Sequence, residues 1–253
     1  MCFYFGKGKP IVDPKDFVMR ENIRLPTSKC ILAFSVRTVR VVREYMENTR
    51  MVPIKIPLYE PTVGKYENED IFVSALNIGA PASVLSLELL IAAGAEEVIV
   101  IGSGGSIHPD ANIGDILIPT WGLREEGTSY HYVGPEYIPK PNVSLLNRLR
   151  NEIGKIVSED VHVVEGGVWS IDAIFRETTD KIREYRNRGV IGVDMESTAL
   201  MTVSHYRNIA LAIALVITDE LYSDSWKYEW ESDRIIRSEK IIALASLRTL
   251  AKG

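Results

Sequence analysis

The sequence predicts an α/β fold in which strands are buried between layers of helices. Residues 71–76 and 98–101 are short apolar runs, and residues 83–93 between them have a helical pattern that ends at Gly94. A connection of this length holds one crossover helix, which makes a right-handed βαβ unit. The second run is unbroken and β-branched, and residues 209–217 are almost wholly apolar. Both patterns are typical of strands that are buried on both faces of a sheet.

The amino-terminal part of the chain predicts one more strand and one more helix. Residues 31–34 are apolar enough for a short buried strand, and Ser35 is a suitable N-cap for a helix that runs to about Met46. Pro53 and Pro57 then indicate a connection or an edge strand, because proline cannot donate to a sheet ladder.

A basic stripe marks the predicted helix after Ser35. Arg37, Arg40 and Arg43 recur at helical spacing beside an apolar face. The simpler interpretation is a solvated helix surface. The alternative is that Arg37, one turn from the start of the helix, reaches a phosphate group.

The carboxyl-terminal part continues the alternation of strands and helices. We expect strands at residues 116–118, 161–170 (two pieces broken by Gly166-Gly167), 190–193 and 209–217, and helices at residues 143–156, 180–188, 197–206 and 234–251. Residues 222–233 mix aromatic and charged side chains without periodicity, which predicts a loop or lid. Residues 125–132 combine polar and aromatic side chains, as both pocket walls and surface hairpins do.

A glycine-rich segment, Gly102–Ser106, follows the apolar run at residues 98–101. Glycines allow backbone N–H groups to approach an anion or a sugar closely. The segment lacks the Gly-Lys-Ser/Thr of a Walker A loop and the Gly-x-Gly-x-x-Gly of a dinucleotide site. Since Gly114-Asp115 leads into the next strand, we expect a loop between two strands, which is either a structural turn or a binding site.

Glu196 follows the apolar residues 190–193 and precedes an amphipathic segment. A carboxylate at the carboxyl end of a strand faces the crevice where open α/β sheets bind ligands. Its two oxygens can each accept a hydroxyl, which matches the cis-diol of a ribose. The alternative is that Glu196 caps the helix that follows.

Composition argues against several classes of function. The chain has 253 residues, is 46% hydrophobic and carries a net charge of −5, a balance that does not favour nucleic-acid binding. No apolar run reaches the roughly 18 residues of a membrane span, and the cysteines and histidines lack metal-ligand spacing. We therefore expect a cytoplasmic protein with no metal site and with neither nucleic acid nor membrane as a partner.

Three segments in this order and spacing resemble the nucleoside phosphorylase family, which includes purine nucleoside phosphorylase, uridine phosphorylase and the nucleosidases. They are residues 101–115, residues 192–197 (Gly-Val-Asp-Met-Glu-Ser) and residues 216–219. Glu126–Tyr130 also resembles the uridine phosphorylase-like branch and one group of AMP nucleosidases. The resemblance implies a three-layer αβα single domain over residues 1–253, with residues 1–28 as an amino-terminal extension. Its central sheet would be mixed, twisted and partly barrel-like, with helices on its flanks.

The resemblance also implies roles for individual residues. Glu196 would hold the ribose hydroxyls, with Met195 packing on the sugar. Asp219 matches the acid that, in purine-specific members, protonates or hydrogen-bonds the leaving base. Cleavage of an N-glycosidic bond builds negative charge on the base, which such an acid stabilises, and this chemistry needs no cofactor.

The remaining implied contacts concern the phosphate and the base. The resemblance assigns phosphate to Ser103, Gly102 and Arg37, and the base to Phe175 and Gly104. It also implies a homo-oligomer, a hexamer or smaller, whose substrates are a nucleoside and inorganic phosphate.

The sequence departs from the family at three positions. Val100 stands where many phosphorylases carry a phosphate-binding arginine, and residues 33–36 lack the usual glycine, aspartate and proline. The Gln-x-Arg pair that uridine phosphorylases use on the pyrimidine is not evident in residues 176–179. A phosphate dianion in a partly buried site needs a charge-assisted partner, so the nucleophile and the base both stay open.

Three functions are therefore compatible with the sequence. The first is a nucleoside phosphorylase, uridine phosphorylase-like, that forms ribose 1-phosphate and a free base. The second is a nucleosidase that hydrolyses the same bond, for example in AMP. The third is a nucleoside-binding protein without catalytic activity, because a fold does not fix a function.

Overall fold

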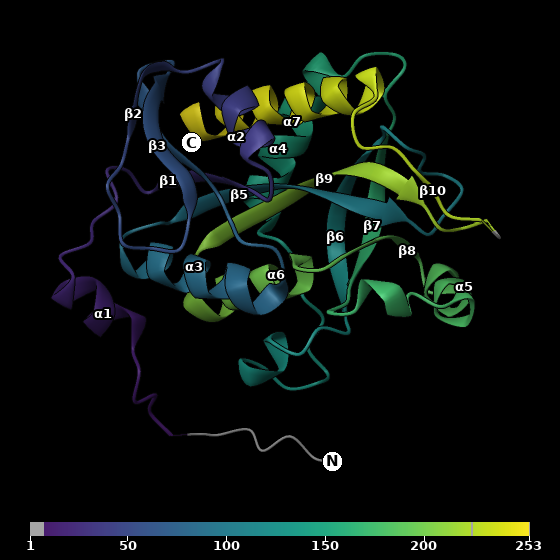
Figure 1. The fold of residues 1–253 in the computed structure, drawn as a ribbon, viewed down its shortest axis with the longest axis horizontal. Coiled ribbons are helices and arrows are strands. Elements are labelled where there is room, and N and C mark those ends of the chain that lie inside the picture. The colour runs from purple at the N-terminus through teal and green to yellow at the C-terminus, as the bar shows by residue number, and fades with distance from the viewer. Residues whose placement is uncertain (1–7, 224, 253) are drawn as a thin grey trace.

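A mixed sheet organises the part of the chain that the computed structural model describes, residues 8–223 and 225–252 (Figure 1). Within these residues ten strands follow the order β10-β9-β6-β7-β8-β5-β1-β4-β3-β2. Their bounds are β1 Lys29–Ala33, β2 Glu47–Met51, β3 Tyr59–Tyr66, β4 Glu69–Ala75, β5 Glu97–Ser106, β6 Ile116–Arg124, β7 Val163–Ser170, β8 Val190–Asp194, β9 Ala210–Glu220 and β10 Lys227–Tyr228.

Five of these strands close into a barrel. β5 pairs in parallel with β9 along its length and antiparallel with β8 at its carboxyl end, while β6 and β7 complete the ring between β9 and β8. β1 pairs with the other end of β5 and continues the sheet through β4, β3 and β2. The predicted mixed, partly barrel-like sheet is confirmed.

Helices cover both faces of the sheet, which confirms the predicted three layers. Figure 1 shows α2, α4 and α7 on one face, and α3 and α6 on the other. Their bounds are α1 Pro14–Arg20, α2 Val36–Arg43, α3 Ala80–Ala92, α4 Val143–Ile156, α5 Thr179–Asn187, α6 Ser197–Arg207 and α7 Asp233–Ala251. No helix among the described residues is both long and apolar enough to cross a membrane.

The alternation of side chains along each strand divides the hydrophobic core between the two helical layers. In β1, Ile31 packs in the cluster beneath α2, α4 and α7, whereas its neighbour Leu32 packs in the cluster beneath α3 and α6. Successive side chains of a strand point to opposite faces, so strands with unbroken apolar runs can supply both clusters. This explains why residues 98–101 show no polar alternation.

Two expectations about local structure need correction, and two elements were not predicted. Gly102–Ser106 is not a loop but the continuation of β5, and residues 163–170 form one strand whose register shifts at Gly167 rather than two pieces. The hairpin of β2 and β3 was not predicted. Neither was α1, which lies within the expected amino-terminal extension and buries Val18.

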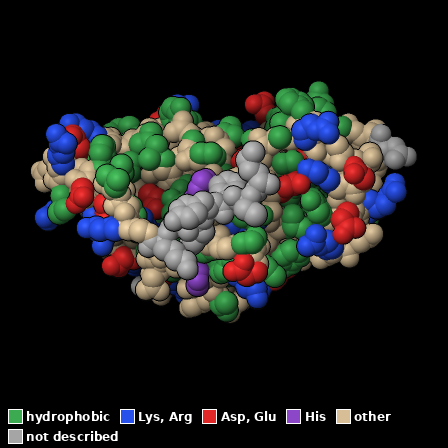
Figure 2. Space-filling view, turned by 90° about the horizontal axis from the view of Figure 1, so that it is seen from below, with side chains coloured by type: hydrophobic (Ala, Val, Ile, Leu, Met, Phe, Trp, Pro, Cys, Tyr) green, Lys and Arg blue, Asp and Glu red, His purple; other side chains and the backbone are tan. Residues whose placement is uncertain are grey.

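The exposed charges are interspersed on the face seen in Figure 2. Lys and Arg side chains stand among Asp and Glu side chains, and the described residues on this face form no continuous basic strip.

Asp115 joins three elements at the entrance to β6. Its carboxyl group is fully buried. Oδ2 accepts the N–H of Asn112 at 2.7 Å, and Oδ1 accepts the N–H of His162 at 3.0 Å. The guanidinium of Arg234, near the start of α7, also donates to Oδ1. Asp115 therefore satisfies backbone donors before β6 and β7 and ties α7 to both.

Replacing Asp115 should lower the free energy of unfolding far more than replacing an exposed charged residue of α7. We expect Asp115→Ala to lower the free energy of unfolding by about 3–5 kcal/mol, because buried donors lose their acceptor. Asp115→Asn, which keeps one carbonyl acceptor, should lose less. Arg237→Ala is the control: its partner Asp160 is as exposed as Arg237 itself, so the loss should be about 0–1 kcal/mol. Urea titration measures all three, and equal losses for Asp115→Ala and Arg237→Ala would refute the assignment.

Candidate active site

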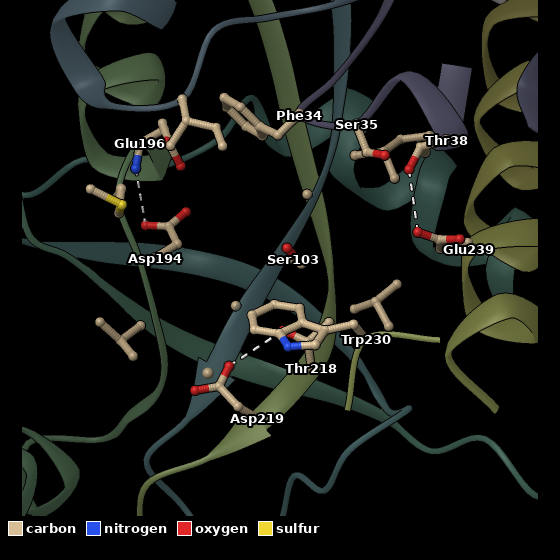
Figure 3. Close-up of a pocket in the computed structure, with 18 of the residues that line it drawn as sticks. Phe34, Ser35, Thr38, Ser103, Asp194, Glu196, Thr218, Asp219, Trp230 and Glu239 are labelled. Atoms are coloured by element: carbon tan, nitrogen blue, oxygen red, sulfur yellow. Dashed lines mark hydrogen bonds between the residues drawn. The ribbon is translucent and has the colours of Figure 1, made fainter. Parts of the chain in front are cut away.

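The carboxyl ends of β5, β8 and β9 meet at a cavity of about 470 Å³ (Figure 3). The junction of β1 and α2, residues 230–231, Ile78, Ile174, Glu177 and Glu239 complete its wall. Ligands of open α/β sheets bind at this edge. All residues that the sequence suggested for the site line the cavity, except Phe175: they are Gly102, Ser103, Gly104, Met195, Glu196, Asp219 and Arg37.

Glu196 does not cap α6 through its side chain, since Asp194 has that role. Asp194 Oδ2 accepts the N–H of Ser197 at 3.1 Å, and Oδ1 accepts the hydroxyl of Ser170 at 2.5 Å. The Glu196 side chain extends to the start of α3, where Oε1 accepts the N–H of Gly79 at 2.6 Å. Gly79 has a φ of +97°, a conformation that other residues rarely adopt. Glu196 is thus held in the cavity wall by a backbone donor.

The environment of Glu196 disfavours its ionised form. Burial raises its pKa to about 8, with a further contribution from the charge of Asp194, while the N–H of Gly79 acts in the opposite direction. Burial also raises the pKa of Asp194, against hydrogen bonds from Ser170 and Ser197. Two neighbouring carboxyl groups in a buried site resist simultaneous ionisation. Burial and the neighbouring Asp194 therefore both favour the protonated form of Glu196 in the absence of a ligand.

Asp219 faces the cavity from the end of β9. It lies opposite Gly105 of β5, where an added Cβ would come within 2.9 Å of Asp219 Oδ2, so the glycine makes room for the carboxyl group. Oδ2 accepts the indole N–H of Trp226 at 2.9 Å, and Oδ1 accepts the hydroxyl of Thr218 at 3.3 Å. Burial raises the pKa of Asp219, although both hydrogen bonds lower it.

Glu177 is a second acid beside Asp219, and no sequence pattern predicted it. It follows the 3₁₀ turn Ile174–Arg176 and lines the cavity. Burial raises the pKa of Glu177 to about 7, and the charge of Asp219 adds to the increase. Raised pKa values on clustered acids in a cleft are characteristic of functional sites. Glu177 is identified as a site residue only by its proximity to Asp219 in the fold, because no periodicity or motif in the sequence points to it.

Arg37 lines the cavity but is already paired. Its Nη2 donates to Glu239 Oε1 at 2.8 Å, and its Nη1 donates to the carbonyl oxygen of Trp230 at 3.4 Å. The hydroxyl of Thr38 donates to the same Glu239 oxygen at 3.3 Å, and the other carboxylate oxygen is buried without a hydrogen-bond partner. Among the described residues of the cavity wall, Arg37 is the one basic side chain. Its charge is therefore largely compensated from α7.

Phe175 lies outside the cavity, contrary to the expectation from the resemblance. Its side chain is 93% exposed, and its neighbour Ile174 lines the cavity instead. Successive side chains of a 3₁₀ turn point about 120° apart. When Ile174 faces the cavity, the residue after it faces solvent.

Two other segments of interest also lie elsewhere. Val100 is fully buried in the core beneath α3 and α6 and does not reach the cavity. In residues 125–132, Glu126 is fully buried and accepts the N–H of Ser129 and the hydroxyl of Thr198. That acid supports the packing of α6 rather than the cavity wall.

The cavity offers hydrogen-bonding chemistry at three places. Glu196 can bind hydroxyl groups, Asp219 and Glu177 can exchange protons, and the Ser103 hydroxyl is exposed on β5 (Figure 3). No group of three or more His, Cys, Asp or Glu among the described residues is arranged to hold a metal ion.

Known proteins resemble this chain in both sequence and fold. Uridine phosphorylase from Thermococcus kodakarensis is 28% identical over 201 residues, which cover 74% of this chain and 72% of that protein. Guanosine phosphorylase from Halorubrum lacusprofundi is 22% identical over 182 residues, 72% of this chain and 74% of that protein. The crystal structure of uridine phosphorylase from Vibrio fischeri ES114 superposes with a TM-score of 0.80 at 24% identity, covering 96% of this chain and 95% of that one.

The model of one protein family covers most of the sequence. It is described as the phosphorylase superfamily and matches residues 30–248. The matched range extends from β1 to α7 and includes every residue of the cavity wall. The chain therefore belongs to the phosphorylase superfamily.

Proposed function

We propose that this protein is a nucleoside phosphorylase, an enzyme that cleaves the N-glycosidic bond of a ribonucleoside with inorganic phosphate. The products are ribose 1-phosphate and a free base. One observation carries the proposal: Glu196, between β8 and α6, and Asp219, at the end of β9, face one cavity with Ser103 on its wall (Figure 3). The names of the relatives agree with this chemistry.

The two acids have complementary tasks in this mechanism. Ionised Glu196 accepts hydrogen bonds from the 2′- and 3′-hydroxyls of the ribose and holds the ring for reaction. Asp219, whose pKa burial raises, donates a proton or a hydrogen bond to the departing base. Phosphate attacks C1′ as the C–N bond breaks, and the bonding electrons leave with the base. Ser103, Gly102 and Arg37 hold the phosphate in this scheme.

Hydrolysis is the second candidate, and the pairing of Arg37 favours it. A phosphate dianion must compete with Glu239 for Arg37, and the buried Glu239 carboxylate repels it. Water carries no such charge. If Arg37 stays with Glu239, water is the nucleophile, and the protein is a nucleosidase.

Two arguments about the base point in different directions. The sequence resemblance favours the uridine phosphorylase-like branch. The acids Asp219 and Glu177, whose pKa values burial raises, favour a purine, because its N7 can accept from a carboxyl group, and uracil offers no ring nitrogen with a free lone pair.

Cleavage assays with and without inorganic phosphate separate the two reactions. We expect turnover of at least one of uridine, inosine, guanosine, adenosine and AMP, with strict dependence on phosphate and release of ribose 1-phosphate. Chromatography of base and sugar products measures both. Phosphate-independent release of ribose or ribose 5-phosphate would establish the hydrolase. If none of the five compounds is cleaved, both proposed reactions are wrong.

Glu239→Gln tests how Arg37 is used. In a phosphorylase the change frees the guanidinium for phosphate, so we expect the KM for phosphate to fall about threefold to tenfold, consistent with one charge-assisted interaction. Initial rates at varied phosphate and saturating nucleoside measure this. Arg40→Gln is the control, because Arg40 pairs with Glu60 on the exposed side of α2 and should leave this KM unchanged. A rise in the phosphate KM of Glu239→Gln contradicts the competition.

Glu196→Gln should separate activity from stability. The amide keeps an oxygen for the N–H of Gly79 but cannot accept both ribose hydroxyls as a carboxylate does, so we expect kcat/KM to fall about 10²-fold. The folded pKa of about 8 lies above the ordinary value of 4.5. Between these pH values the folded state binds a proton that the unfolded state lacks, so this carboxyl group lowers stability as pH rises.

The glutamine variant lacks that titration, so its Tm should fall less between pH 5 and pH 8 than that of the wild type. Thermal unfolding across this range measures the difference. Parallel Tm curves would show that Glu196 titrates normally, and unchanged kcat/KM would remove it from the sugar site.

A further inference from the structure

Three aromatic side chains alternate along a segment whose last residue lines the cavity. We name residues 226–230 the aromatic strap; it contains β10 and carries Trp226, Tyr228 and Trp230 at every second position. Neighbouring ring centroids are 4.5 Å and 6.0 Å apart. Alternate residues of an extended segment share one face, so the rings form a row. Each is more than half exposed.

The strap is fixed at both ends to groups of the candidate active site. β10 pairs with the last residues of β9, and the N–H of Glu229 donates to the carbonyl oxygen of Thr218 at 2.9 Å. Trp226 hydrogen-bonds the Asp219 carboxyl group, and the Trp230 carbonyl accepts from Arg37. The strap thus runs from the acid to the arginine, and its last ring lines the cavity.

Trp230 brings an indole ring to the cavity wall at the end of the strap. Its backbone is held near the acid, because the N–H of the preceding Glu229 donates to Thr218, the residue before Asp219. In the view of Figure 3 the indole overlaps Thr218, and Phe34 is the other labelled aromatic ring of the wall. The Trp230 side chain is 53% exposed, so much of its apolar surface has no protein contact. An exposed indole at the mouth of a polar cavity is suited to stacking against a planar ligand.

We propose that Trp230 is the stacking platform for the heterocyclic base of the substrate, at the place that the resemblance assigned to Phe175. This inference rests on the proposed function, because it takes the ligand to be a nucleoside. Stacking uses the π face that every base possesses, so it adds affinity without choosing between purine and pyrimidine. That choice falls to Asp219 and Glu177.

Trp230→Leu and Trp230→Phe distinguish stacking from simple bulk. Leucine keeps an apolar side chain without a π face, so we expect the KM for the nucleoside to rise about fivefold to 100-fold, with kcat within about threefold. Phenylalanine keeps a ring and should stay within about threefold of the wild-type KM. Tyr228→Phe, which does not line the cavity, is the matched control and should not change KM. Initial-rate kinetics on the best substrate of the panel give all four values.

Binding of free bases separates failure of this inference from failure of the proposed function. Calorimetric titration with uracil, hypoxanthine and adenine should show that Trp230→Leu loses the affinity that wild type and Trp230→Phe retain. If the wild type cleaves nucleosides and the two variants share one KM, Trp230 does not stack the base, and the proposed function stands. If the wild type neither cleaves a nucleoside nor binds a base, both proposals fail.

Discussion

The site depends on the closure of the barrel through β5. This strand is paired with β1 and β9, and at its carboxyl end it is also paired with β8. Only this double pairing brings the chain before Glu196 and the chain around Asp219 to one cavity. The closure requires glycine, because a Cβ on Gly104 would come within 2.7 Å of the carbonyl oxygen of Val193. The glycines that suggested a binding loop in the sequence are therefore needed for the close contact between β5 and β8.

The same cavity concentrates carboxyl groups whose ionisation the fold does not favour. Glu196 and Glu177 both titrate well above their ordinary range, and the Asp194 cap adds another buried charge. A pocket arranged in this way stores free energy that a ligand with matching donors can release on binding. The same groups therefore contribute both to stability and to ligand recognition.

The sequence predicted what depends on local pattern. Strand and helix positions follow from apolar runs, and Glu196 and Asp219 follow from short motifs at strand ends. It could not predict Glu177, Glu239 or Trp230, because each acquires its meaning from a partner far along the chain. The Arg37–Glu239 ion pair joins α2 to α7, and no rule of residue spacing predicts a pair so far apart in the sequence. Phe175 lies outside the cavity for the opposite reason: a motif position was transferred, but the local 3₁₀ turn directs its side chain outward.

Barrel closure leaves the sheet with just two free borders among the described residues, β10 and β2. β10 is two residues long, too short to template another chain. All five residues of β2 are exposed, but it carries Glu47 and Arg50, a register shift between them and a left-handed Asn48. Charges and irregular backbone on a border strand oppose intermolecular β-pairing. The charges and the irregular backbone of β2 therefore disfavour aggregation through this edge of the sheet.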